Sequence, residues 1–191
     1  MKSTIIASSL FSLLPAIMAL PAPALAQEAE VSNNFVGISA RSASPIHLLP
    51  VVTHNSAFWL GGETYSYCPT QVEPNCPPGN TTVFAGGDEY LGLGVLVPGG
   101  QSVYIAQDGS MTHTTAHSAY YPPGAVRDGW TRTEGENFGH LSHEAGLVAC
   151  PVEGGYKIFA QIPTFVAPNE DCLGFSFLTG NVTEQVGAWQ Y

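Results

Sequence analysis

Lysine and arginine are scarce in this sequence, and their scarcity limits the partners that the chain can bind. The 191 residues include five lysines and arginines against fifteen aspartates and glutamates, so the formal net charge at pH 7 is −10. A surface with that acidic excess repels phosphate backbones and lacks the basic patch of nucleic-acid-binding proteins. We therefore expect no nucleic-acid partner.

Long apolar runs are missing outside the N-terminal segment. There a basic residue precedes an apolar stretch at residues 5–20, and the sequence Ala-Leu-Ala follows at residues 24–26, a pattern typical of a cleaved signal peptide. We predict a signal peptide over residues 1–26 and a single mature domain over residues 27–191. No later segment reaches the roughly 18 apolar residues of a spanning helix, and residues 182–191 lack the apolar tail of a lipid-anchor signal. The sequence thus predicts a secreted protein with no membrane partner.

Signatures of catalysis are absent as well. The sequence has no G-x-S-x-G nucleophile elbow, and its glycine pairs join predicted strands instead of opening a phosphate-binding helix. A glycosidase needs only two carboxylates, but the acidic side chains that could serve fall in predicted turns, where a solvated position is the simpler interpretation. We expect a protein that is not an enzyme and has no cofactor, with a glycoside hydrolase as the least favoured alternative. The acids considered are Asp88, Glu89, Glu134, Glu136 and Glu144.

Two histidine pairs raise the question of a metal site. His113 and His117 are four residues apart, and His140 and His143 are three apart. On a helix these spacings would bring each pair to one ion, but both segments have the character of strands. Strand residues four apart lie about 13 Å apart, and strand residues three apart face opposite ways. We therefore predict no metal site and interpret these histidines as solvent-facing strand residues.

Four cysteines follow the signal peptide, and their even number predicts two disulfides in an oxidising compartment. Three pairings are possible. We favour Cys68–Cys76, which would close a proline-rich loop, and Cys150–Cys172, which would tie a central hairpin to the last sheet segment. A zinc site is the alternative, but C-x7-C is not a typical ligand spacing.

No segment combines helical periodicity with a cap and a length of ten residues. Instead, 21 glycines and 15 prolines separate about a dozen short apolar runs, a spacing typical of all-β domains. The clearest hairpin covers residues 147–162, where apolar side chains alternate in the second arm and Gly154-Gly155 supplies the turn. We predict antiparallel hairpins in a β-trefoil-like barrel, with a β-sandwich as the alternative.

The other predicted elements follow the same reasoning. Residues 81–85 and 90–97 are interpreted as a hairpin that turns at residues 86–89, and residues 182–189 as a final strand. Further strands are predicted at residues 36–40, 46–52, 57–60, 102–106, 111–116, 130–133, 138–142 and 173–177.

Two N-x-[ST] motifs predict N-glycosylation at Asn80 and Asn181. Both asparagines lie beside glycine or proline, in predicted exposed turns.

Exposed aromatic side chains could stack on sugar rings. Tyr120 and Tyr121 are the better candidates for glycan stacking, because Pro122-Pro123 follows them and prevents a regular strand. Trp59, Trp130 and Trp189 are more simply interpreted as core residues.

Five segments resemble a known family. They are FVGISARSASPIH (35–47), VYIAQDGSM (103–111), GWTRTEGENFGHLS (129–142), LVACPVEGGYKIFA (147–160) and EDCLGFSF (170–177). Together they resemble the small secreted cell-wall proteins of filamentous fungi that are associated with phialide and conidium development and are often labelled IgE-binding proteins. The resemblance implies a cell-wall or extracellular location, a part in asexual sporulation or stress protection, and IgE recognition.

These observations favour a non-catalytic structural or interaction role outside the fungal cell. The partners expected are a cell-wall polysaccharide or an extracellular protein. A carbohydrate-binding module and a secreted effector are the alternatives.

Overall fold

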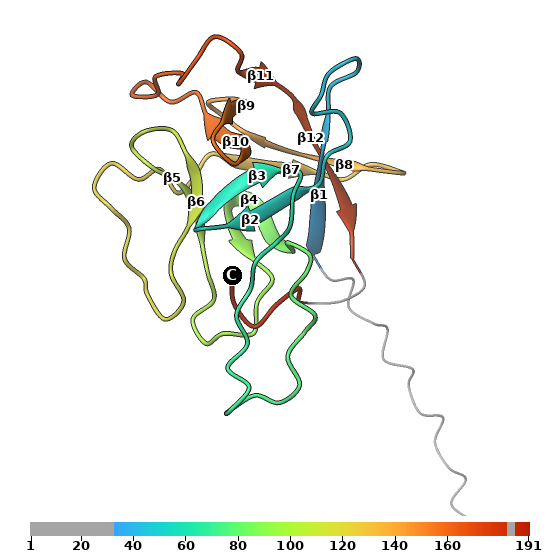
Figure 1. The fold of residues 1–191 in the computed structure, drawn as a ribbon, viewed down its shortest axis with the longest axis vertical. Helices are drawn as coiled ribbons and strands as arrows, with labels where there is room; N and C mark the ends of the chain where they lie inside the picture. Colours follow the sequence, from blue (N-terminus) through green and yellow to red (C-terminus); the bar gives the residue numbers. More distant parts are fainter. Residues whose placement is uncertain (1–32, 183–185) are drawn as a thin grey trace, which may run out of the picture. The chain divides into compact units, whose positions relative to one another are not determined.

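The computed structural model describes residues 33–182 and 186–191, so the predicted signal peptide lies outside the described residues. The described residues form twelve strands and no helix, which confirms the all-β class (Figure 1). None of these residues belongs to a helix long and apolar enough to cross a membrane. The strands are β1 (Asn34–Ala40), β2 (Val51–His54), β3 (Ala57–Leu60), β4 (Phe84–Leu93), β5 (Val103–Ile105), β6 (Met111–His113), β7 (Trp130–Thr133), β8 (Gly139–His143), β9 (Leu147–Val152), β10 (Gly155–Ala160), β11 (Leu173–Gly174) and β12 (Ser176–Asn181).

Five of the strands close into a barrel. Their order is β1-β12-β8-β7-β4, and all neighbours are antiparallel. The barrel closes where Asn34 and Phe35 of β1 pair with Ala85 and Phe84 of β4. Closure leaves this sheet without an exposed edge.

The remaining strands form a seven-stranded sheet, in the order β11-β9-β10-β3-β6-β5 with β2 paired to β3. The predicted central hairpin is confirmed as β9 and β10, which pair from Gly155↔Val152 to Ala160↔Leu147. Because β10 also pairs with β3, this hairpin lies in the middle of the sheet. A barrel beside an open sheet is consistent with both architectures that the sequence suggested.

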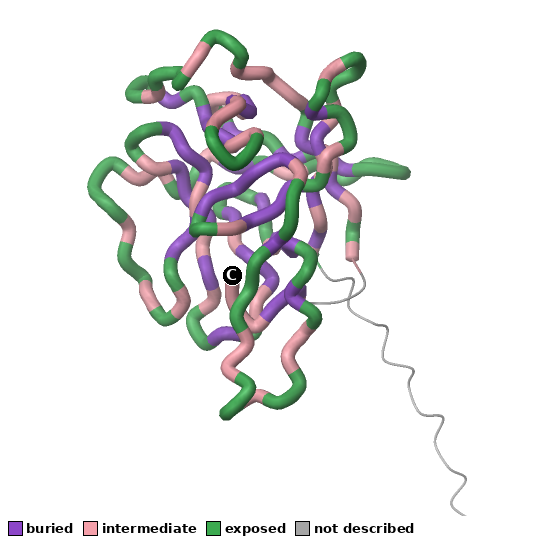
Figure 2. The backbone as a smooth tube through the Cα atoms, in the orientation of Figure 1, coloured by how far each residue is buried: buried purple, intermediate pink, exposed green. Residues whose placement is uncertain are grey.

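The core joins the barrel to the open sheet. Phe35, Phe84 and Phe177 belong to the barrel, and Phe58 belongs to β3 of the open sheet. Phe84 contacts the other three rings, with centroids 5.4–5.6 Å apart. All four residues are buried. Figure 2 shows that buried segments, drawn in purple, gather in the interior of the fold. Burial of each phenylalanine stabilises the fold by about 2–3 kcal/mol relative to an exposed ring.

Gly37 in β1 allows this close packing. A Cβ at this position would lie 2.0 Å from Cε2 of Phe177 on the neighbouring strand. Glycine is therefore required here by the approach of the phenylalanine ring and not by a turn.

Three predicted elements differ from the structure. The strand predicted at residues 46–52 begins only at Val51, because residues 46–48 lie in a turn. The segment predicted to turn at residues 86–89 continues as one ten-residue strand, β4, because Asp88 and Glu89 pair with Thr131 and Trp130 of β7. The glycines there do adopt positive φ, but they bend a strand that has a partner on β7. In the final strand predicted at residues 182–189, described residues 186–189 contain only an isolated bridge at Ala188, and residues 183–185 lie outside the described residues.

Both predicted disulfides are present. Cys68–Cys76 closes the proline-rich loop, and Cys150–Cys172 joins β9 to the segment before β11. The second bridge lies beside the short ladder in which Leu173 pairs with Ala149. It therefore holds the edge strand β11 to the sheet.

Candidate functional site

His113 points into the protein, contrary to the prediction that it faces solvent. Its side chain is 3% exposed, and its Nε2 lies 3.1 Å from the hydroxyl of Thr53. Its Nδ1 lies 3.1 Å from the side-chain nitrogen of Gln101 and 3.0 Å from the carbonyl oxygen of Thr114. Burial lowers the pKa of His113, and the Thr114 carbonyl opposes only part of that shift.

His143 is the second histidine that the prediction placed wrongly. It is 4% exposed, its Nδ1 accepts a hydrogen bond from the amide of Ala145 at 3.2 Å, and its Nε2 donates to the carbonyl of Asp128 at 3.1 Å. These partners assign the neutral imidazole with the proton on Nε2. Burial lowers the pKa of His143, although the Asp128 carbonyl and the Glu144 charge oppose the shift.

The partners in each histidine pair face different environments. His117 and His140 are exposed, while His113 and His143 are buried. Strand alternation could have revealed this, because His113 follows buried Met111 by two residues and His143 follows buried Leu141 by two. In residues 33–182 and 186–191, no group of three or more histidine, cysteine, aspartate or glutamate side chains could hold a metal ion.

His113 belongs to a buried polar network. The hydroxyl of Thr53 donates to the carbonyl of Ala57 at 3.1 Å, and the amide of Thr53 donates to the hydroxyl of Thr82 at 2.9 Å. The hydroxyl of Thr82 also lies 2.8 Å from that of Thr64. All the threonines involved are buried. We call Thr53, Thr64, Thr82, Gln101, His113 and Tyr191 the buried network.

Gln101 connects this network to Tyr191. The amide nitrogen of its side chain donates to the backbone oxygen of Tyr191 at 2.8 Å, and its carbonyl oxygen accepts from the backbone nitrogen of Tyr191 at 2.7 Å. The phenol of Tyr191 donates to the carbonyl of Thr81 and accepts from the amide of Val83. Burial raises the pKa of that phenol to about 12. The segment after β12 is therefore fastened to the segment before β4.

A second group of polar and aromatic side chains lies at the surface. Tyr120, predicted to stack on glycans, is 67% exposed. The guanidinium of Arg127 lies 4.2 Å from the ring centroid of Tyr121 and 5.9 Å from that of Tyr90, and the edge of Tyr121 meets buried Tyr104. We call Tyr90, Tyr120, Tyr121 and Arg127 the tyrosine surface.

The sequence did not predict Tyr90 and Arg127 as members of this surface. Tyr90 lies 30 residues before Tyr120, and Arg127 lies only seven residues after it, but no spacing rule links the three. Their meeting depends on the pairing of β4 with β7, since Tyr90 follows the paired residue Glu89 and Arg127 precedes Trp130.

An open groove begins next to Tyr121. It has a volume of about 650 Å³ and is lined by residues that include Pro122, Pro123 and Asp108. Asp108 is an exposed residue whose partial desolvation raises its pKa, but hydrogen bonds from the hydroxyl and amide of Ser110, together with the charge of Lys157, lower the pKa overall. The groove therefore offers an ionised carboxylate beside proline rings. The rest of its lining is Ala106, Gln107, Ser110 and Thr164.

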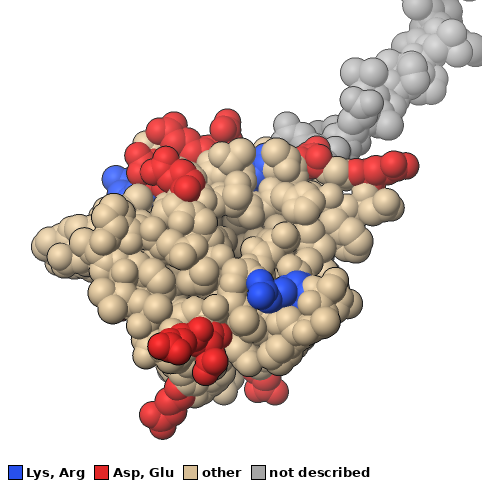
Figure 3. All heavy atoms as spheres, turned by 90° about the horizontal axis from the view of Figure 1, so that it is seen from above, with Lys and Arg blue, Asp and Glu red and all other residues tan. Residues whose placement is uncertain are grey.

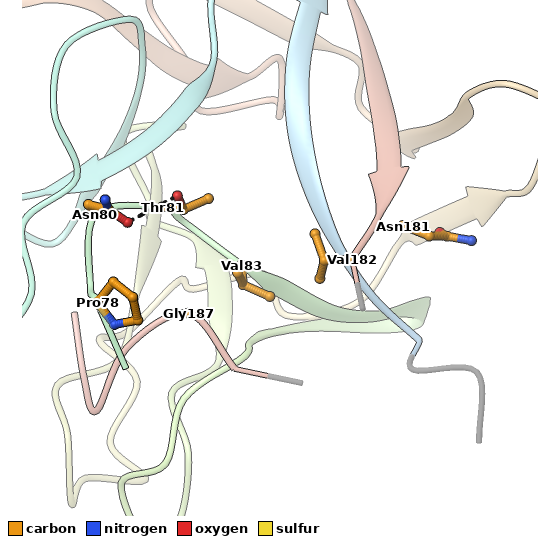
Figure 4. A pocket seen from close by; sticks show the side chains of 7 residues that line it. All are labelled: Pro78, Asn80, Thr81, Val83, Asn181, Val182 and Gly187. Carbon is orange, nitrogen blue, oxygen red and sulfur yellow. Dashed lines mark hydrogen bonds between the residues drawn. The ribbon is translucent and has the colours of Figure 1, made fainter. Parts of the chain in front are cut away.

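The two predicted glycosylation sites border one pocket. Asn80 and Asn181 lie on its rim, and its volume is about 380 Å³ (Figure 4). Asn80 is exposed and accepts a hydrogen bond from the hydroxyl of Thr81 at 3.4 Å. Asn181 is also exposed, but its side-chain oxygen accepts from the guanidinium of Arg132. The asparagines thus differ in how firmly each is held.

Charge is distributed in patches. On the face drawn in Figure 3, acidic side chains form several separate groups, and most of the surface between them is uncharged. Such a surface suits a ligand that makes hydrogen bonds and stacking contacts better than one that carries many negative charges.

Comparison with known proteins gives the family. The chain matches the PhiA-like secreted protein family over residues 35–191. It is 39% identical over 155 residues to an uncharacterized secreted protein of Arthroderma benhamiae, an alignment that covers 75% of this chain and 77% of that protein. The search of solved structures found no match. Both descriptions name secreted proteins and support an extracellular location, and the family match confirms the resemblance found in the sequence. The chain belongs to the PhiA-like secreted protein family.

Proposed function

We propose that this protein acts outside the fungal cell as a non-catalytic component of the cell wall. One observation carries the proposal: the two buried histidines and all the cysteines are already committed to the fold. His113 and His143 use both ring nitrogens in internal hydrogen bonds, and all four cysteines are in disulfides. A scaffold of this kind serves structure or binding better than acid–base or thiol chemistry.

The developmental part of the proposal comes from the family resemblance. We infer a role in phialide and conidium formation or in wall stress resistance, together with recognition by IgE. The test is a deletion strain, scored for spore-bearing cells and for growth on wall-perturbing dyes, and compared with the same strain after the gene is restored. Normal spores and unchanged resistance in the deletion strain would contradict this role.

Polysaccharide binding is a second candidate, and the tyrosine surface favours it. Arg127 stacks on Tyr121, which fixes the ring, while exposed Tyr120 is left to contact a ligand. The adjoining groove adds a carboxylate and amide and hydroxyl groups that can bind sugar hydroxyls. Rigid aromatic rings beside a few polar groups are typical of sites that bind neutral ligands.

A retention assay separates the two candidates. Purified mature protein is mixed with insoluble chitin, β-glucan or mannan, and the bound fraction is measured beside product analysis of the supernatant. Binding by the tyrosine surface predicts at least tenfold weaker retention for Tyr120→Ala and Tyr121→Ala. Tyr65→Ala is the matched control, because Tyr65 is 59% exposed and lies near His54, outside the tyrosine surface. No retention on any polymer would favour an extracellular protein partner, as for a secreted effector.

The hydrolase alternative makes its own prediction in the same assay. Glu134 and Glu136 line a pocket of about 320 Å³ with Arg132, so two carboxylates do lie near one another. Both residues are exposed, however, whereas a glycosidase acid needs an environment that keeps it protonated. We expect no soluble product from any polymer, and release of sugar that Glu134→Gln abolishes would overturn the non-catalytic proposal.

A further inference from the structure

The acceptor motif at Asn80 is divided between the surface and the core. Asn80 and Thr81 are exposed, but Thr82, the third residue of the motif, is only 2% exposed. The hydroxyl of Thr82 accepts a hydrogen bond from the amide of Thr53 at 2.9 Å and lies 2.8 Å from the hydroxyl of Thr64. This hydroxyl is therefore enclosed in the buried network.

The backbone around the motif is fixed on both sides. The amide of Gly79 donates to the carbonyl of Gly187 at 2.9 Å, and the phenol of Tyr191 donates to the carbonyl of Thr81 at 2.6 Å. The same phenol accepts from the amide of Val83 at 3.0 Å. Rotation of the segment to expose Thr82 would break all of these bonds together with those of the threonine itself.

N-glycosylation requires access to that hydroxyl. The motif accepts serine or threonine at its third position, and the feature shared by these two side chains is the hydroxyl, so the transferase must contact it. In the folded domain a transferase that approaches Asn80 cannot reach the hydroxyl of Thr82.

We propose that Asn80 carries an N-linked glycan that is attached only before the domain folds, and that folding then closes the acceptor site. The donor is an oligosaccharide linked to a lipid pyrophosphate. The side-chain nitrogen of Asn80 forms a bond to the anomeric carbon of the sugar, the bond from that carbon to the phosphate oxygen breaks, the amide loses one proton, and the lipid pyrophosphate leaves.

Occupancy at Asn80 is then set by a competition between transfer and folding. The Cys68–Cys76 disulfide ends four residues before Asn80, so its formation brings the segment towards its folded arrangement. A reducing agent added during synthesis in a secretory host should therefore raise the fraction of chains that carry the glycan. This dependence distinguishes the site from an acceptor in a permanently exposed loop.

The direct test compares folded and unfolded forms of one preparation. Mature protein made without glycans, with both disulfides formed, is incubated with oligosaccharyltransferase and a lipid-pyrophosphate oligosaccharide. A reduced and alkylated sample, shown to be unfolded by circular dichroism, receives the same treatment. Mass spectrometry of the peptide with Asn80 then gives the modified fraction. We expect at least tenfold more modification in the unfolded chain, and none in an Asn80→Gln variant.

A control acceptor shows whether the enzyme can act on this protein when it is folded. Val166, Ala167 and Pro168 are exposed, so Val166→Asn combined with Pro168→Thr creates a motif with an accessible hydroxyl. This acceptor should be modified in both forms. Equal modification of Asn80 in the folded and unfolded chains would overturn the proposed order of events. Failure to modify Asn80 in either form, with the control acceptor modified, would overturn the site itself.

Discussion

The buried network and the tyrosine surface both contain polar side chains, but those of the network bond within the protein and those of the surface are available to a ligand. In the network, Gln101, His113 and Thr82 are almost completely buried, and each bonds to other protein groups. At the surface, Tyr120 and Arg127 are exposed. Polar groups inside a protein are costly when unpaired, whereas those outside are free to meet a ligand. We therefore expect substitutions in the network to change stability, and substitutions at the surface to change binding.

The largest expected effect follows loss of Gln101. Gln101→Ala removes the partners of the Tyr191 backbone and of His113, which leaves several buried polar atoms unpaired. We expect the free energy of unfolding to fall by about 3 kcal/mol, measured by urea denaturation. The matched control is Gln107→Ala, because Gln107 is exposed and should change stability by less than about 0.5 kcal/mol. Equal effects from the two variants would contradict the distinction between network and surface.

A smaller loss is expected when Thr82 is replaced by valine. The substitution keeps the shape of the side chain but leaves the amide of Thr53 and the hydroxyl of Thr64 without their partner. We expect a loss of about 2 kcal/mol in protein made without glycans, so that removal of the acceptor motif has no influence. Thr81→Val is the control, since Thr81 is exposed. Thermal unfolding that is unchanged by Thr82→Val would show that the hydroxyl does not stabilise the fold.

Much of the fold could be predicted from local patterns, but the burial of the network and the assembly of the tyrosine surface could not. The strand Trp130–Thr133, the hairpin of β9 and β10 and both disulfides follow from alternation, turn residues and cysteine spacing. Those signals are carried by neighbouring residues. The predicted turn at residues 86–89 was wrong because a distant strand, β7, supplies hydrogen bonds that override the local glycine signal.

The candidate site was harder to predict because it depends on which face of each strand is buried. The sequence predicts that His113 faces solvent, yet His113 shares the inward face of its strand with Met111. The prolines that follow Tyr120 and Tyr121 did indicate exposed rings, and the structure shows Tyr120 exposed and Tyr121 half-buried. Tyr90 joins them through strand pairing, which composition and spacing do not determine, and no spacing rule marks nearby Arg127 as their partner.

Acidification should lower the free energy of unfolding through the buried histidines. Burial lowers the pKa values of His113 and His143 below the ordinary value of 6.5, so the unfolded chain binds protons more readily than the folded one. The stability that these neutral histidines contribute is complete above pH 6.5 and is lost as the pH falls towards their folded pKa values. We expect the free energy of unfolding to decrease between pH 7 and pH 5.

Replacement of one histidine should flatten this pH dependence. In His113→Gln the slope of the free energy of unfolding against pH should be shallower than in the wild type, and His143 and His54, whose pKa is also lowered by burial, should supply the remainder. His117→Gln is the control, because His117 is exposed. Asp108 does not interfere, since its lowered pKa places its loss of stabilisation below pH 3.8. A His113→Gln slope equal to that of the wild type would mean that burial of His113 does not govern the acid response.

The smallest effect on stability is expected at Tyr120, where a loss of binding without a loss of stability would separate the tyrosine surface from the buried network. Tyr120→Ala removes a ring that is 67% exposed, so the free energy of unfolding should change by no more than about 0.5 kcal/mol. The same variant should lose retention on whichever wall polymer the wild type binds, since stacking of a sugar on an exposed ring needs that ring. Denaturation and retention are measured on the same preparation of Tyr120→Ala, and both measurements are repeated for Thr82→Val. The expected pattern is reciprocal: Thr82→Val loses stability but, while folded, still binds, and Tyr120→Ala keeps stability but does not bind. Loss of both properties in Tyr120→Ala would mean that the tyrosine surface supports the fold and is not reserved for a ligand.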